Sequence, residues 1–132
     1  MLENILPSLR FKKLWLIIGW SLVLLVIGLT LMSSPPPLPS IEYNDKIGHI
    51  LAYFVLMGWF AQLYHAPKQR LTYLIGFLLL GGTLEILQSL GGVRHGEWAD
   101  MLANSTGVLL AWYLTKTRLA YTLAYVEQKL SF

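Results

Sequence analysis

The run LWLIIGWSLVLLVIGLTLM, from Leu14 to Met32, contains no charged residue. A helix needs roughly 20 predominantly apolar residues to cross a bilayer core, so this run is long enough to span one. Backbone groups in lipid must bond within the segment, which predicts a helix over 14–32. Arg10, Lys12 and Lys13 precede the run as in a secretory signal. The run is longer than a signal core of about 7–15 residues, so we interpret it as a retained anchor.

Three further apolar runs follow and predict helices over 47–64, 71–90 and 100–116. None of them shows the strict alternation of a membrane barrel strand. The sequence therefore predicts an all-α protein: an integral membrane four-helix bundle over 14–116. The alternative, a soluble helical bundle, leaves too few polar positions to coat its surface.

The composition favours a membrane protein as well. Of 132 residues, 55% are hydrophobic and 13% charged, whereas a typical soluble domain has about 25% charged residues. The mean hydropathy is +0.55. The absence of cysteine excludes disulfides, thiolate metal sites and cysteine nucleophiles. The net charge of +3 is modest and its basic residues form no stripe, so nucleic acid is not an expected partner.

The basic residues predict the orientation of the helices. One side of the predicted topology carries Arg10, Lys12, Lys13, Lys68, Arg70, Lys116, Arg118 and Lys129, and the other side carries only Lys46 and Arg94. Positively charged loops stay in the cytoplasm, so both termini are expected there. Residues 1–13 and 117–132 have apolar residues at helical spacing, which predicts short amphipathic helices on the cytoplasmic face of the membrane.

Polar residues gather at the opposite end of the predicted bundle. Asp45 and His49 are four residues apart, Glu85 and Gln88 three apart, and Asp100 and Asn104 four apart, so each pair shares a helix face. The topology places all three pairs, with Lys46 and Arg94, at the outer ends of their helices. A charged side chain facing hydrocarbon costs roughly 2.5 kcal/mol or more, so these faces are expected to meet in one outward-facing polar pocket.

The residue types suggest acid–base chemistry in that pocket. Candidate catalytic residues are Glu85 as a general base, His49 as a proton shuttle, and Asp100. Candidate substrate-binding residues are Asp45, Lys46, Gln88, Arg94 and Asn104, with Arg94 suited to hold an anion. No pattern has diagnostic metal-ligand spacing, so neither a metal site nor a cofactor is expected, although Asp45, Asp100 and Glu85 offer oxygen ligands for a divalent cation.

A structural explanation exists for the same residues. Glu85 could pair with Arg94 or His49 to hold the helices together. Asp100 could be a favourable charge at a helix N-terminus, and Asn104 could bridge two helices. The stripe of small residues formed by Ala99, Ala103, Gly107 and Ala111 lies beside the Asp100–Asn104 face. Such a stripe allows close approach of another helix, and we interpret it as a packing feature.

Three segments together resemble the signature of VanZ-like membrane proteins. They are DKIGHILAYFVL, EILQSL followed by an arginine, and EWADMLANSTG. The matching residues are Asp45, Lys46, His49, Glu85, Gln88, Arg94, Asp100, Asn104 and Gly107. The resemblance covers roughly residues 45–114 and agrees with the predicted order and topology. It implies a bacterial envelope protein of the inner membrane, in a family whose namesake is associated with resistance to the glycopeptide teicoplanin.

Two hypotheses of function follow. In the first, the pocket binds or processes an anionic, lipid-linked envelope precursor, and the protein's other partners are membrane lipids. In the second, the polar cluster only locks the helix bundle, and the protein is a structural or interaction module. Proton or ion transport needs polar residues in the cytoplasmic half, where Gln62 and Thr72 are the main candidates.

Overall fold

The computed structural model describes residues 9–31, 44–91 and 98–130, apart from the side chains at positions 44–46, 88, 89, 98 and 118. Four long helices make up most of this part: α1 (Lys12–Leu31), α2 (Asn44–Leu63), α3 (Pro67–Gly91) and α4 (Trp98–Leu114). A short 3₁₀ turn, η2 (Arg118–Tyr121), then leads into α5 (Thr122–Lys129). The described residues contain no strand, so this part of the protein is all-helical.

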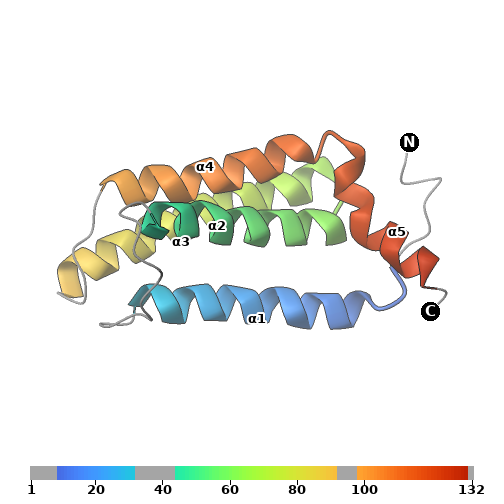
Figure 1. Cartoon of the computed structure of the whole chain (residues 1–132), viewed down its shortest axis with the longest axis horizontal. Helices are drawn as coiled ribbons and strands as arrows, with labels where there is room; N and C mark the ends of the chain where they lie inside the picture. The colour runs from blue at the N-terminus through green and yellow to red at the C-terminus, as the bar shows by residue number, and fades with distance from the viewer. Residues whose placement is uncertain (1–8, 32–43, 92–97, 131–132) are drawn as a thin grey trace.

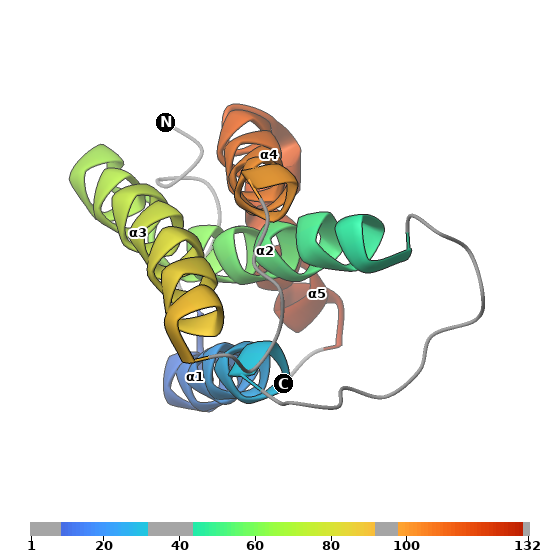
Figure 2. The same ribbon diagram turned by 90° about the vertical axis from the view of Figure 1, so that its left-hand side faces the viewer.

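Helix α2 occupies the centre of the assembly. Its neighbours α1, α3 and α4 surround it, and successive long helices run in opposite directions (Figures 1 and 2). The most extensive packing is between α2 and α4. As a result, one end of the bundle gathers the beginnings of α2 and α4 and the last turns of α3. The opposite end gathers the start of α1, the α2–α3 turn, η2 and α5.

Two glycines allow helices to approach α2 closely. A Cβ atom at Gly107 of α4 would overlap the Ile50 carbonyl oxygen and lie 3.0 Å from the Phe54 amide nitrogen. A Cβ atom at Gly19 of α1 would lie 2.8 Å from Cδ1 of Trp59. Ala103 and Ala111 lie one turn to either side of Gly107 and are buried. The small-residue stripe of α4 is therefore the surface that packs against α2.

Aromatic rings fill the core between α2 and α3. Phe60 is fully buried, and its ring stacks on Tyr73 at 4.7 Å between centroids and tilts against Phe77 at 5.6 Å. Tyr64 also stacks on Tyr73, at 5.2 Å between centroids. Such ring pairs contribute about 0.5–1.5 kcal/mol beyond the area that they bury. This cluster holds α3 against the central helix.

The outer surface of the bundle is apolar. Leu24 of α1, Leu79 of α3 and Leu102 of α4 are 69%, 65% and 68% exposed. Among the described residues, two helices are long and apolar enough to cross a membrane: Lys12–Leu31, with mean hydropathy 2.5, and Pro67–Leu87, with 1.5. A shorter apolar helix covers Ile47–Leu63. The interior, by contrast, contains the buried side chains of Glu85, Asp100, Asn104 and Glu127.

The C-terminal segment differs from the single helix predicted over 117–132. The Thr117 hydroxyl accepts a hydrogen bond from the Leu119 amide, starting a 3₁₀ turn before α5. Ala124 and Glu127 of α5 are buried. Leu119 of η2, Val126 of α5 and Leu130 after it are exposed. Part of the apolar face of this segment is therefore left uncovered by the rest of the protein. The amphipathic helix predicted within residues 1–13 lies mostly outside the described residues.

A buried carboxylate joins the two ends of the chain. Glu127 Oε1 accepts the Arg10 backbone N–H at 2.7 Å, and Oε2 accepts the Phe11 N–H at 3.2 Å and the Trp15 indole N–H. These donors belong to the first turn of α1 and the residues before it, where helices leave backbone N–H groups unbonded. Burial raises the pKa of Glu127, but the hydrogen bonds and the Arg10 charge outweigh it and lower that pKa below its ordinary value.

Gln62 and Arg70 form hydrogen bonds at the end of the bundle that contains η2 and α5. The Gln62 amide donates to the Leu119 carbonyl at 2.6 Å and accepts from the Leu123 N–H at 2.9 Å. The Arg70 guanidinium donates to the carbonyls of Tyr64, Ala61 and Thr115 at 2.9, 3.0 and 3.4 Å. Gln62, a candidate for a proton path, is thus bonded to the backbone of the C-terminal segment. The Thr72 hydroxyl donates to the Lys68 carbonyl of its own helix.

Candidate functional site

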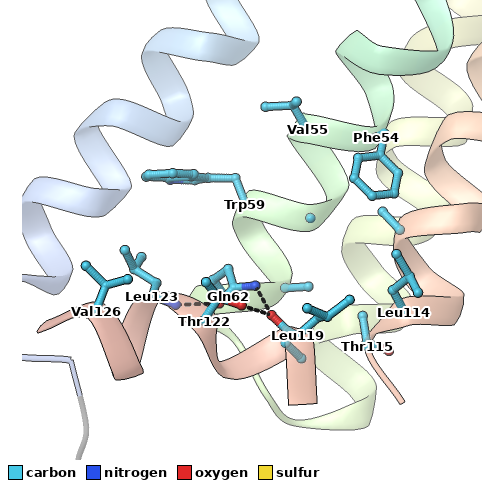
Figure 3. Close-up of a pocket in the computed structure, with 14 residues that line it drawn as sticks. Phe54, Val55, Trp59, Gln62, Leu114, Thr115, Leu119, Thr122, Leu123 and Val126 are labelled. Carbon is cyan, nitrogen blue, oxygen red and sulfur yellow. Dashed lines mark hydrogen bonds between the residues drawn. The ribbon is translucent and has the colours of Figure 1, made fainter. Parts of the chain in front are cut away.

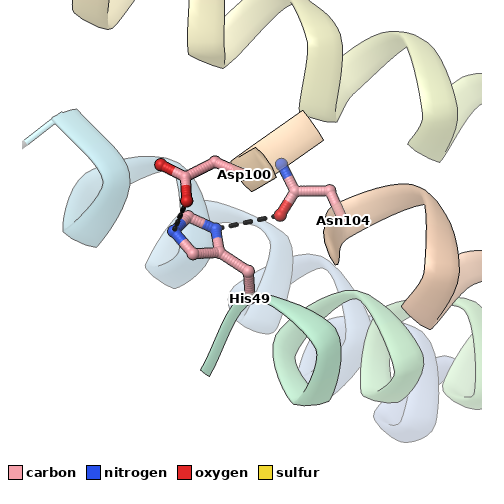
Figure 4. Close-up of polar contacts among 3 residues, drawn as sticks. All are labelled: His49, Asp100 and Asn104. Atoms are coloured by element: carbon pink, nitrogen blue, oxygen red, sulfur yellow. Dashed lines mark hydrogen bonds and ion pairs between the residues drawn. The ribbon is translucent and has the colours of Figure 1, made fainter. Parts of the chain in front are cut away.

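The candidate site lies at the end of the bundle where α2 and α4 begin. His49 of α2 lies against two side chains of α4 (Figure 4). Its Nδ1 atom is 2.9 Å from Asn104 Oδ1, and its Nε2 atom is 4.0 Å from Asp100 Oδ1. Asp100 and Asn104 are buried, and the His49 side chain is only 13% exposed. The structure therefore brings together three of the predicted site residues.

The hydrogen bond to Asn104 determines how the imidazole can act. A carbonyl oxygen only accepts, so the Nδ1 atom of His49 carries the hydrogen and donates it. In the neutral imidazole the lone pair is then on Nε2, the atom that faces Asp100. A proton taken up at Nε2 would lie 4.0 Å from an Asp100 carboxylate oxygen. The arrangement suits a histidine that accepts and returns a proton.

Close helix packing positions these side chains. Ile50, whose carbonyl contacts Gly107, directly follows His49, so the near contact of α2 and α4 sets the reach from His49 to Asn104. Helix α3 also approaches Asn104 closely: a Cβ atom at Gly81 would lie 3.1 Å from Asn104 Cβ and 3.2 Å from its Nδ2. Asn104 is thus enclosed between α2 and α3. A larger residue at either glycine would displace part of the site.

Asp100 occupies the first turn of α4. The exposed N–H groups of that turn carry partial positive charge, which stabilises a carboxylate. This is the structural role that its position in the sequence suggested, and it is compatible with the contact to His49. Asp100 thus faces a helix N-terminus and an imidazole together.

Glu85 of α3 is 4% exposed and lies one helical turn beyond Gly81 on the same face. That face packs against α2 and α4, so the carboxylate points into the bundle. Tyr53 of α2 is 1% exposed, and its phenol lies within electrostatic reach of Glu85. Within the part of the chain that the structure describes, the Tyr53 hydroxyl has no hydrogen-bond partner. Buried hydroxyls normally have one, so Tyr53 joins the site as a potential ligand contact.

Sequence reasoning did not single out Tyr53, because the tyrosines were interpreted as interfacial and packing residues. The available signal was its spacing: Tyr53 follows His49 by four residues and therefore shares its helix face. Glu127 and Trp15 were missed as a polar pair for a different reason. They are separated by 112 positions, and nothing in the local pattern relates them.

The remaining predicted site residues are not placed as side chains. Asp45 and Lys46 lie in the first turn of α2 and Gln88 near the end of α3, but their side chains are outside the described part. Arg94 lies entirely outside the described residues. Of the eight predicted residues, the structure thus describes the side chains of His49, Glu85, Asp100 and Asn104.

The described site is acidic and amide-lined. Its side chains are two buried carboxylates, one imidazole, one carboxamide and one phenol. Over residues 9–31, 44–91 and 98–130, no three histidine, aspartate or glutamate side chains are grouped as metal ligands would be. Its imidazole and carboxylates can transfer protons, and its carboxamide and phenol can form hydrogen bonds. Comparison with known proteins gives no match to any family model, curated protein or solved structure.

Proposed function

We propose that this chain is a VanZ-like integral membrane protein of the bacterial envelope. Its four long helices cross the inner membrane with both termini in the cytoplasm. The end of the bundle that contains His49 and Asp100 opens to the outer side. There it binds or processes an anionic, lipid-linked envelope precursor, with Lys46 and Arg94 as the cationic contacts.

The distribution of side chains supports the membrane location. Large apolar residues are exposed on all four long helices, while glutamate, aspartate and asparagine are buried. A soluble helix normally shows the reverse arrangement, with an apolar stripe inside and charges outside. Ionisable residues in membrane helices face the bundle interior and are commonly functional.

The observation that carries the site proposal is the placement of His49 between Asn104 and Asp100. One nitrogen is fixed as a donor, and the other is available to exchange a proton next to a carboxylate. A histidine held this way is prepared for general acid–base work. An outward-facing site in an apolar bundle is accessible to a substrate with a lipid anchor, whose charged head would lie at the membrane surface.

A second function is supported by the same hydrogen bond. His49 and Asn104 belong to different helices, and side-chain hydrogen bonds between membrane helices stabilise their association by about 0.6–2 kcal/mol. On this alternative, the polar cluster locks α2 to α4, and the protein acts as a structural or interaction module.

One experiment distinguishes the binding function from the structural function. The full-length protein is purified in detergent and titrated with a polyprenyl phosphate, and its thermal stability is followed. We expect the probe to stabilise the wild type, and His49→Gln and Asp100→Asn to lose that stabilisation while still folding. The matched control is Thr106→Ala, because Thr106 is exposed on α4 and bonds only its own helix at Leu102. If the polyprenyl phosphate stabilises both site variants as much as the wild type, the binding proposal is wrong. If both variants unfold without the probe, the structural function is favoured.

A further inference from the structure

An apolar groove of about 410 Å³ lies at the other end of the bundle, away from the polar site (Figure 3). Helix α2 supplies its back wall with Phe54, Val55 and Trp59, and α4 supplies one side with Leu114. The turn η2 and helix α5 form its floor with Leu119 and Val126. Small-molecule sites in proteins measure roughly 300–1,000 Å³, so the groove is large enough for a ligand of its own.

The groove offers a ligand almost no free polar group. Gln62 uses its amide on the Leu119 carbonyl and its oxygen on the Leu123 N–H. The hydroxyls of Thr115 and Thr122 donate to the carbonyls of Trp112 and Leu119. The polar side chains that line the groove are therefore already bonded within the protein. An occupant would contact hydrocarbon and aromatic surface, which fits an aliphatic chain.

Basic residues neighbour the groove lining in the chain. Lys116 directly follows the lining residue Thr115, and its ammonium lies 5.3 Å from the Trp112 ring centroid. Lys129 lies three residues after Val126, and its ammonium lies 5.5 Å from the Tyr125 ring centroid. Among the described residues of this end, the acidic side chain is Glu127, which is buried and bonded to Arg10, Phe11 and Trp15. Among the described residues, no carboxylate is shown paired with Lys116 or Lys129.

We infer that this groove binds one acyl chain of an anionic phospholipid from the inner leaflet, whose phosphate lies beside Lys116 and Lys129. The inference rests on the proposed membrane location with this end in the cytoplasm. In that orientation α5 lies at the cytoplasmic end of the bundle, and the groove between α2, α4 and α5 lies at the level of the inner leaflet. An unfilled groove would forfeit the dispersion contacts of its lining, whereas an extended chain supplies them.

The test uses the full-length protein, extracted from the membrane fraction and stripped of lipid in detergent. Native mass spectrometry measures binding of phosphatidylglycerol and, separately, phosphatidylcholine. Val55→Trp places an indole in the groove from a position that is 45% exposed, so folding is preserved. We expect it to weaken phosphatidylglycerol binding at least about fivefold, equivalent to roughly 1 kcal/mol of lost contact. The matched control, Leu79→Trp, alters an exposed residue of α3 outside the groove and should bind as the wild type does.

The headgroup is tested by the double variant Lys116→Gln, Lys129→Gln. A basic residue near an anionic lipid surface contributes about 1 kcal/mol, so the preference for phosphatidylglycerol should fall at least about fivefold. Equal binding of Val55→Trp and wild type, or equal binding of the two lipids by wild type, would overturn the inference. So would a dimer mass that disappears in Val55→Trp, because the occupant would then be a second copy of the chain. Recovery of the protein outside the membrane fraction would instead refute the proposed function itself.

Discussion

The imidazole of His49 links to α4 through both of its ring nitrogens, at 2.9 Å from Asn104 and 4.0 Å from Asp100. The two α4 residues are one helical turn apart, so a single imidazole spans the turn. Asn104 and Asp100 therefore have different roles toward His49. Asn104 accepts the hydrogen bond that fixes the ring, whereas Asp100 faces the other nitrogen, Nε2.

The first prediction follows from that difference. Asn104→Ala leaves the buried Nδ1–H of His49 without its acceptor, and we expect a loss of about 1–3 kcal/mol in unfolding free energy. Asp100→Asn keeps the shape of the side chain and removes only the charge, so its effect on unfolding should be smaller. Unfolding of the purified variants in detergent, followed by circular dichroism, measures both. Greater destabilisation by Asp100→Asn than by Asn104→Ala would contradict this division of roles.

The second prediction concerns the close contact of α2 and α4. Gly107→Ala introduces a methyl group that overlaps the Ile50 carbonyl oxygen, and overpacking of this kind costs about 1–3 kcal/mol. Gly76→Ala on α3 is the matched control, because a Cβ atom there meets no neighbour within 4 Å. It should be neutral or stabilise by up to about 1 kcal/mol through helix propensity. Comparable melting temperatures for the two variants would show that α2 and α4 are not in backbone contact.

The third prediction is a pH dependence of stability due to Glu127. Its pKa in the folded protein is lowered, so its contribution to stability is present at neutral pH. That contribution is lost as the pH falls from the ordinary glutamate range, near about 4.3, through the lower folded value. Melting temperatures measured across this acid range should fall for the wild type and stay flatter for Glu127→Gln. Gln128→Glu, at the exposed neighbouring position, should keep the wild-type slope; identical slopes for all three proteins would argue against the assignment.

The fourth prediction tests the orientation. The chain has no cysteine, so single cysteines can be introduced without a background. In intact spheroplasts, Lys46→Cys should react with a membrane-impermeant maleimide, and Lys68→Cys should react only after the membrane is opened. The reason is the excess of basic residues at the Lys68 end of the bundle. The reverse labelling pattern would invert the topology and place the polar site in the cytoplasm.

Local patterns in the sequence predict helices well in this chain, because each long helix is a sustained apolar run. The all-helical class is confirmed over residues 9–31, 44–91 and 98–130. Helical spacing also identified the shared faces of Asp100 and Asn104, and the structure places His49 against that face. The break between η2 and α5 was not predicted, because Leu119, Leu123, Val126 and Leu130 keep helical spacing across it.

Contacts between distant segments were less accessible to prediction. That Glu127 would bond the start of α1 depends on where α5 folds back, which no local periodicity encodes. The Tyr53 hydroxyl was overlooked because a tyrosine in an apolar helix usually serves packing. In both cases the decisive factor is the three-dimensional position of a polar group whose sequence neighbours are ordinary.

The bond between Glu127 and the start of α1 has a consequence for biosynthesis. Arg10 leaves the ribosome early, and Glu127 is 117 residues behind it. The first helix is therefore made long before the carboxylate that bonds it has been translated. Until residue 127 has been made, α1 relies on its contacts with α2 and α3. A chain truncated after residue 126 lacks Glu127 and its hydrogen bonds to the start of α1, so α1 should be held less tightly. A nascent chain of that length would therefore expose α1 to quality-control proteases.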